Sequence, residues 1–145
     1  MSKVLRYGFL LAVAGTMLQA QSLMAADGIE GHLVNVKWLE KNLKNSDVLI
    51  LDASPAQIFA AKHIPGAVSV DIYAWYGLQE MPVADMEKLC QSWGISPGKM
   101  IVMYDPGGTM LATRLFYSLY YYGFPAKDLV ILDGGLFKWQ EAGLP

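Results

Sequence analysis

The sequence contains few of the residues that would cross-link the chain or give it a strong charge. Cys90 is the one cysteine among 145 residues, so no disulfide forms within the chain. Arg6 and Arg114 are the two arginines, the net charge is −2 and no basic cluster occurs, which argues against nucleic-acid binding. Repeats and low-complexity runs are also absent. The length and the 54% hydrophobic composition fit one globular domain.

Residues 1–26 have the pattern of a secretory signal peptide. Lys3 and Arg6 supply a positive start, Phe9–Leu18 forms an apolar core, and Ala25 and Ala26 offer small residues for cleavage. The residues three positions before these two cleavage points are not small, so the cleavage site stays open. An anchor that spans the membrane is disfavoured, because the apolar core is shorter than the roughly 20 residues needed. We therefore expect export to the periplasm, and membrane contact only through an uncleaved signal segment.

Cys90 lies in a helical pattern and is interpreted as a packing residue. Met86, Leu89, Cys90 and Trp93 fall at positions i, i+3, i+4 and i+7, which form one apolar face of a helix. A nucleophilic thiolate needs an accessible, electropositive setting, and the nearby Lys88 points to another face. The sequence therefore predicts a buried, unreactive thiol.

The mature chain, residues 27–145, alternates apolar runs with helical patterns. Strands are predicted over 48–51, 68–70, 100–104 and 129–132, and helices over 36–43, 55–61, 82–93, 110–122 and 136–141. Residues 27–34 are interpreted as a polar, glycine-containing lead-in. This alternation predicts a single α/β domain whose central sheet is mainly parallel and flanked by helices.

The segment that organises the chain is the apolar run Met100–Tyr104 with the loop that follows it. The loop consists of Asp105, Pro106, Gly107, Gly108 and Thr109, and it leads into the long apolar helix. Free N–H groups and the helix dipole favour an anion or a nucleophile at such a position. Open α/β sheets place their sites at this edge, so the function depends on what Asp105 does there.

Three acidic residues, Asp52, Asp105 and Asp133, each follow an apolar strand. In a parallel sheet all three would lie at its carboxyl edge, where carboxylates are candidate ligands for a divalent metal. Aspartate is also common as a helix cap and as a residue that ties a turn. We adopt this second, structural interpretation and expect no metal and no cofactor.

Three motifs, in order, resemble those of the rhodanese family. His63-Ile64-Pro65-Gly66-Ala67, after Asp52, resembles its first motif, and Asp133-Gly134-Gly135-Leu136-Phe137-Lys138-Trp139 with Gly143-Leu144-Pro145 resembles its closing motif. Between them, Tyr104-Asp105, Gly108, Ala112 and Arg114 resemble the central loop and helix of the N-terminal domain of thiosulfate and 3-mercaptopyruvate sulfurtransferases. Lys62 departs from the pattern, since the family usually has glycine there.

The resemblance implies a sulfurtransferase chemistry that this loop lacks. In the family's catalytic domain, a cysteine after the central strand takes a sulfane sulfur from a donor, holds it as a persulfide and passes it to a thiophilic acceptor. Asp105 occupies that position here, and a carboxylate cannot form a persulfide. The chain therefore resembles the non-catalytic N-terminal half, whose expected partner is a catalytic rhodanese domain.

Several roles are assigned on the same basis. Asp105 is expected to accept hydrogen bonds from the N–H groups of its own loop, filling the place of an external anion. For Arg114 a structural ion pair with Asp105 is favoured over a simple surface position. His63 is interpreted as a turn residue and Trp139 as a core residue.

Two alternatives remain open. The loop after Asp105 also resembles, weakly, that of haloacid dehalogenase-like phosphatases, in which an Asp is the phosphoryl nucleophile and Mg²⁺ is required. The second Asp of that motif is Gly107 here. The other alternative is a docking module with an aromatic surface formed by Tyr73, Trp75 and Tyr76.

Overall fold

The computed structural model describes residues 28–75, 77 and 80–145, and the predicted signal peptide lies outside them. The strands are β1 (Ile29–Glu30), β2 (Leu33–Val34), β3 (Val48–Asp52), β4 (Val68–Ser69), β5 (Met100–Tyr104) and β6 (Leu129–Leu132). The helices are α2 (Val36–Asn42), α3 (Ala56–Ala61), α4 (Val83–Ser92), α5 (Leu111–Tyr121) and α6 (Gly135–Glu141), with 3₁₀ turns η1 (Ile72–Trp75) and η3 (Ala126–Asp128). None of the helices within the described ranges has both the length and the apolar character to cross a bilayer.

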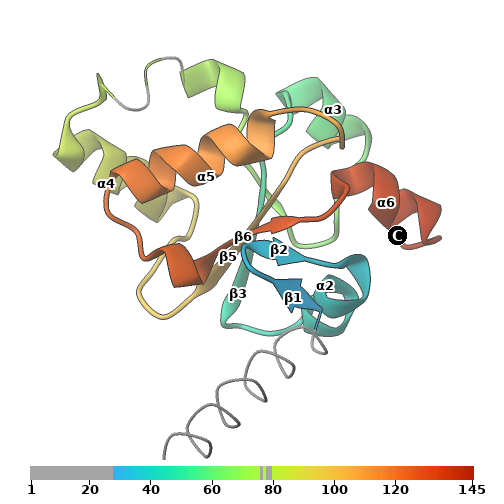
Figure 1. Cartoon of the computed structure of the whole chain (residues 1–145). Coiled ribbons are helices and arrows are strands. Elements are labelled where there is room, and N and C mark those ends of the chain that lie inside the picture. The colour runs from blue at the N-terminus through green and yellow to red at the C-terminus, as the bar shows by residue number, and fades with distance from the viewer. Residues whose placement is uncertain (1–27, 76, 78–79) are drawn as a thin grey trace, which may run out of the picture.

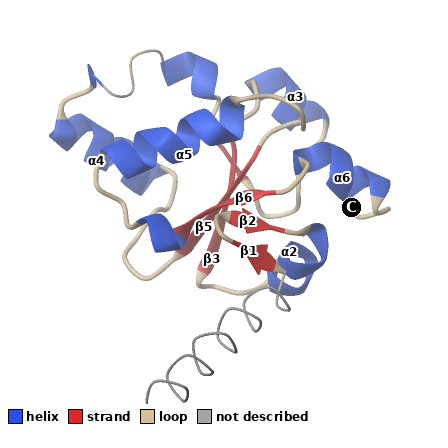
Figure 2. Ribbon diagram, viewed as in Figure 1, coloured by secondary structure: helices blue, strands red, loops and turns tan. Residues whose placement is uncertain are grey.

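The strands form one six-stranded sheet in the order β1-β2-β6-β5-β3-β4 (Figure 2). Every neighbouring pair is parallel except the N-terminal hairpin of β1 and β2. The central strand β5 pairs with β3 from Met100↔Val48 to Tyr104↔Asp52. Parallel neighbours on both sides explain why β3, β5 and β6 are apolar along most of their length. The predicted α/β fold is confirmed.

Helices cover both faces of the sheet (Figure 1). On one face, α4 and α5 bury Leu89, Leu115 and Leu119 against the β5 side chain Met103. On the other face, α2 and α6 bury Leu39 and Trp139 in a second apolar cluster. Successive side chains of a strand point to opposite faces, so β5 contributes to both clusters. This central position fixes the end of β5 at the middle of the carboxyl edge.

The N-terminal hairpin corrects the sequence interpretation of residues 27–34. That segment was interpreted only as a polar lead-in, but its strands β1 and β2 extend the sheet beyond β6. His32 O accepts from Ile131 N at 2.7 Å, Val34 O accepts from Asp133 N at 2.9 Å, and Val34 is fully buried. These two-residue strands lie in a polar, glycine-containing segment that shows no strand pattern in the sequence. β2 forms by pairing with β6, almost 100 residues away, and β1 pairs with β2.

Candidate functional site

The candidate site is the loop between β5 and α5, at the middle of the carboxyl edge. β5 ends at Tyr104 and α5 begins at Leu111, so residues 105–110 form the connection. Asp105 is 5% exposed, whereas Gly108, Thr109 and Met110 are exposed. The loop therefore presents its tip to solvent and keeps its one charged side chain inside.

The Asp105 carboxylate is held by the loop itself. Oδ1 accepts from the backbone N–H of Gly107 at 2.9 Å. Oδ2 accepts from Thr109 Oγ1 at 2.6 Å and from the N–H of Ala112 at 3.1 Å. Ala112 lies in the first turn of α5, whose N–H groups have no partner within the helix. The expected bonds from the loop's own N–H groups are formed, and the carboxylate lies at the N-terminal end of α5, where helix N–H groups favour negative charge.

The loop is also interlocked with the start of α6. Leu136 N donates to Asp105 O at 2.8 Å, and Phe137 N donates to Pro106 O at 3.0 Å. Gly135 has φ +59°, and a Cβ there would overlap the Asp105 carbonyl oxygen and lie 2.9 Å from Gly107 N. Glycine is therefore needed where the closing motif, Asp133–Trp139, approaches the backbone of the loop.

Asp52 and the first motif, residues 63–67, meet at Tyr104. Asp52 is fully buried, and its Oδ1 accepts from Ser54 N at 2.8 Å. Ile64 N donates to the Tyr104 hydroxyl at 3.0 Å, which ties the motif to the end of β5. Burial, and then the neighbouring Asp52 carboxylate, raise the pKa of Tyr104. Asp52 is therefore buried at the point where the first motif meets the end of β5.

The other residues of the carboxyl edge have separate partners. Asp133 is exposed and pairs with Lys138 of α6. Asp71, which was not among the candidates, has φ +39° and accepts from Ala56 N at 3.2 Å through Oδ2. Its signal in the sequence is the one shared by the other three, an Asp after an apolar strand. Among the residues described, no group of three histidine, cysteine or acidic side chains is arranged to hold a metal ion.

The predicted ion pair between Asp105 and Arg114 is wrong. The ion pairs of the described part of the chain are Lys88–Asp85 and Lys138–Asp133. The Asp105 carboxylate is directed into its own loop, where its recorded partners are Gly107, Thr109 and Ala112. Asp105 and Arg114 are only nine residues apart and both lie near the N-terminal end of α5, but the direction of the carboxylate depends on the geometry of the loop.

Trp139 is a core residue, as the sequence interpretation expected, whereas His63 immediately precedes the turn of residues 64–67. His63 is exposed, stacks on Phe59 with ring centroids 4.1 Å apart, and has Nδ1 2.9 Å from the Phe59 carbonyl oxygen. Trp139 is fully buried, and its Nε1 donates to Pro145 O at 2.6 Å. The Trp139 bond ties the end of the closing motif to the core of the α6 face.

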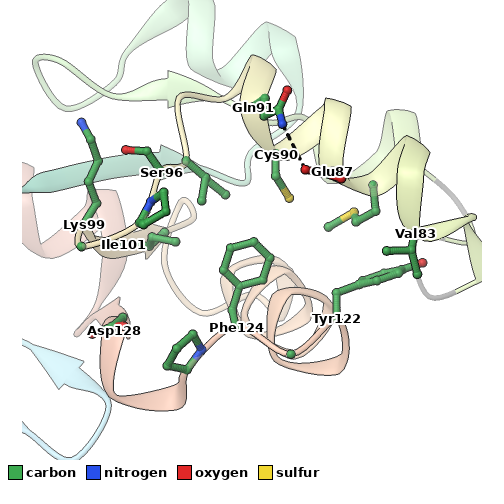
Figure 3. A pocket seen from close by; sticks show the side chains of 16 residues that line it. Val83, Glu87, Cys90, Gln91, Ser96, Lys99, Ile101, Tyr122, Phe124 and Asp128 are labelled. Carbon is green, nitrogen blue, oxygen red and sulfur yellow. Dashed lines mark hydrogen bonds between the residues drawn. The ribbon is translucent and has the colours of Figure 1, made fainter.

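Cys90 lies in α4, as a wall residue of a cavity of about 690 Å³ between α4 and the C-terminal end of α5. Figure 3 shows its sulfur directed across the cavity toward the ring of Phe124. Cys90 is 4% exposed, and burial raises the pKa of its thiol to about 11. Glu87 on the same helix is acidic and accepts from Gln91. The prediction of a buried packing cysteine is confirmed, since this setting disfavours the thiolate.

These features define a class of protein: a parallel α/β domain whose candidate site is a strand-to-helix loop locked against a closing motif. The rhodanese-like domain family model matches residues 35–142, and the chain belongs to this family. The matched region contains every element of the candidate site.

The chain is similar to several curated sulfurtransferases. It is 30% identical to thiosulfate/3-mercaptopyruvate sulfurtransferase 2 of Arabidopsis thaliana, over 98% of this chain and 45% of that protein. It is 30% identical to the 3-mercaptopyruvate sulfurtransferase of Escherichia coli K12, over 77% of this chain and 44% of that protein. The chain thus spans about half the length of the curated relatives that it matches.

The fold comparison agrees. The crystal structure of SseA from Escherichia coli, described as a 3-mercaptopyruvate sulfotransferase with the rhodanese fold, matches with a TM-score of 0.68 and 27% identity. The match covers 79% of this chain and 49% of SseA. YnjE, at 23% identity and a TM-score of 0.67, shares the fold.

Proposed function

We propose that this chain is the non-catalytic, N-terminal-type half of an exported rhodanese-type sulfurtransferase. The sulfur donor would be thiosulfate or 3-mercaptopyruvate, and the acceptor a thiophile such as cyanide or a thiol. In this proposal a cysteine of a partner rhodanese domain carries the sulfur. The similarity to thiosulfate and 3-mercaptopyruvate sulfurtransferases supports the substrate class, and the greater length of these relatives supports a second domain.

The observation that carries the proposal is the hydrogen bonding of Asp105. A persulfide forms when a thiolate attacks a sulfane sulfur, and no sulfur atom is present at Asp105. The loop donors that would steady a persulfide anion are already bound to the carboxylate. The residues after Asp105, Pro106–Thr109, carry no cation that would attract an anionic donor.

The apolar residues beside the loop support a docking role. Met110, at the start of α5, is 74% exposed, and Phe137, at the start of α6, is 63% exposed. Phe137 is in contact with the loop, since its N–H donates to Pro106 O. Two large apolar side chains beside the loop tip are suited to burial against another domain.

A sulfur-transfer assay tests the proposal. The protein alone, given cyanide with either thiosulfate or 3-mercaptopyruvate, should release no thiocyanate above the blank. A separately purified rhodanese domain that carries the loop cysteine should bind the protein, and Met110→Ser and Phe137→Ser should weaken that binding. Val83→Ser is the matched control, because Val83 is 72% exposed on α4.

Three outcomes would contradict the assignment. Thiocyanate release that is abolished by Asp105→Ala and unaffected by Cys90→Ser would give the loop a catalytic role. Release that is lost with Cys90→Ser would move the nucleophile to Cys90. Hydrolysis of p-nitrophenyl phosphate that requires Mg²⁺ and Asp105 would support the phosphatase alternative.

A further inference from the structure

A second cavity, of about 670 Å³, lies beside α2 near the amino ends of β5 and β6. Met100, the first residue of β5, lines it, whereas Asp105 follows the last residue of that strand. At about 3.3 Å of rise per residue, five residues put the two sites roughly 17 Å apart. The cavity is therefore a separate feature, and nothing in the sulfur chemistry uses it. Its volume falls in the range of small-molecule sites, about 300–1,000 Å³.

The charge of this cavity has one sign. Lys37 and Lys41 of α2 and Lys127 of η3 line it, and none of the described residues that line it is acidic. Lys88 and Lys138 form ion pairs with neighbouring carboxylates, but these three lysines take part in none of the ion pairs in the described ranges. The protein as a whole carries a net charge of −2, so the positive charge of this cavity is opposite in sign to the net charge of the protein. Like charges around a concave surface concentrate the field and attract anions.

The remaining wall contains a large aromatic side chain. Trp38 and Met100 line the cavity, and both also pack against the apolar cluster under α2. Asn35 and Asn42 add amide groups to the lining. Tryptophan offers flat apolar surface with well-defined geometry for a second ring. The cavity thus combines an apolar wall with three cations from two different elements.

We propose that this cavity binds a small organic anion in which a planar ring carries a phosphate group, as in an aryl phosphate or a nucleotide. The ring packs against Trp38 and Met100. The phosphate, with more than one negative charge, lies among Lys37, Lys41 and Lys127. The site is independent of the proposed sulfurtransferase role.

Titration with ADP, followed by NMR of methyl-¹³C-methionine, tests the proposal. The Met100 methyl signal should shift and saturate. The signals of Met86, which lines the α4–α5 cavity, and of Met110, beside the Asp105 loop, should stay in place. Raising the ionic strength from about 0.01 M to 0.1 M shortens the Debye length from about 30 Å to 10 Å and should weaken binding several-fold.

Lysine-to-glutamate variants show which lysines contribute to the binding of ADP. Lys41→Glu and Lys127→Glu should each weaken ADP by about tenfold or more, since each replaces an attraction with a repulsion. Lys44→Glu makes the same charge change just beyond α2, outside the cavity lining, and should change the affinity by less than about twofold under screening salt. Adenosine, which lacks the charge, and pyrophosphate, which lacks the ring, should each bind at least about tenfold more weakly than ADP.

Each of several results would overturn the proposal. The first is a Met100 signal that does not move at millimolar ADP. The second is an equal loss of affinity in Lys44→Glu, which would reduce the effect to the general field of the protein. The third is pyrophosphate binding as tightly as ADP, and the fourth is a shift of Met86 in place of Met100.

Discussion

The contribution of the Asp105 carboxylate to the stability of the protein can be measured by replacing Asp105 with alanine. Asp105→Ala leaves three donors without their acceptor: Gly107 N, Thr109 Oγ1 and Ala112 N. Thr109 is exposed and can bond to water, but Ala112 is 2% exposed. A buried donor without a partner costs about 1–3 kcal/mol, and a hydrogen bond to a charged group contributes about 1.5–3 kcal/mol.

These contributions are not additive, because one side chain makes all three bonds and the loop can relax. We expect Asp105→Ala to lower the free energy of unfolding by about 3 kcal/mol. With an m-value near 2 kcal/mol/M in urea, the midpoint would fall by roughly 1.5 M. Asp105→Asn keeps the size and one acceptor oxygen and should lose about half as much. Urea unfolding at pH 7, followed by circular dichroism, measures the difference.

Asp133→Ala is the matched control. It removes a carboxylate that also follows a strand at the carboxyl edge, but Asp133 is 50% exposed and pairs only with Lys138. Such an exposed pair contributes about 0–1 kcal/mol. If Asp105→Ala were no more destabilising than Asp133→Ala, the hydrogen bonds would not support the loop. The interpretation of Asp105 as a structural substitute for an anion would then be refuted.

Four further predictions follow from the same structure. In a Cys90→Ser background, Asp105→Cys should place a thiol among the N–H groups of Gly107 and Ala112, so the pKa of this thiol should fall below about 8.5. Iodoacetamide should therefore alkylate it faster than it alkylates Cys90 in the wild type, and equal alkylation rates would contradict this prediction. Gly135→Ala should destabilise the protein more than Gly143→Ala. Both glycines have positive φ, but only at Gly135 would an added Cβ overlap backbone atoms of the Asp105 loop. Equal urea midpoints would show that the loop shifts to make room for the Cβ. Burial raises the pKa of the Cys90 thiol from 9.0 to about 11. The buried neutral thiol therefore stabilises the fold fully below pH 9, and this stabilisation is lost as the pH rises toward 11. The free energy of unfolding of the wild type should fall more steeply over that pH range than that of Cys90→Ala. N-terminal sequencing of exported protein should begin at Asp27 or Ala26, and an intact Met1 would contradict cleavage.

Much of the fold could be predicted from local patterns. The apolar runs that became β3, β5 and β6 are buried by neighbours on both sides, so hydrophobicity alone marked them. The helical spacing of Met86, Leu89 and Cys90 predicted both α4 and its buried face. β1 and β2 were missed because β2 depends on pairing with β6, which lies far away in the sequence, and β1 only extends β2.

The sequence predicted which residues form the loop of the candidate site, but only some of the contacts that they make. Spacing located Asp105 after the central strand and ahead of a helix N-terminus, and the hydrogen bonds to the loop followed from that position. The ion pair with Arg114 failed, because a side-chain direction depends on loop dihedral angles that sequence spacing does not contain. The cavity with three lysines could not be predicted either, since Lys127 is 86 residues from Lys41.

The sequence by itself determined the α/β class, the order of the main strands and helices, and the presence of an acidic residue, Asp105, directly after the central strand. These properties depend on residue type and on spacing along a few turns, and such local patterns are readable without coordinates. The tertiary structure alone decided the N-terminal hairpin, the contact of Gly135 with the Asp105 loop and the gathering of lysines beside Trp38. Each of these joins segments that are distant in the chain, and packing of the two faces of the sheet brings them together.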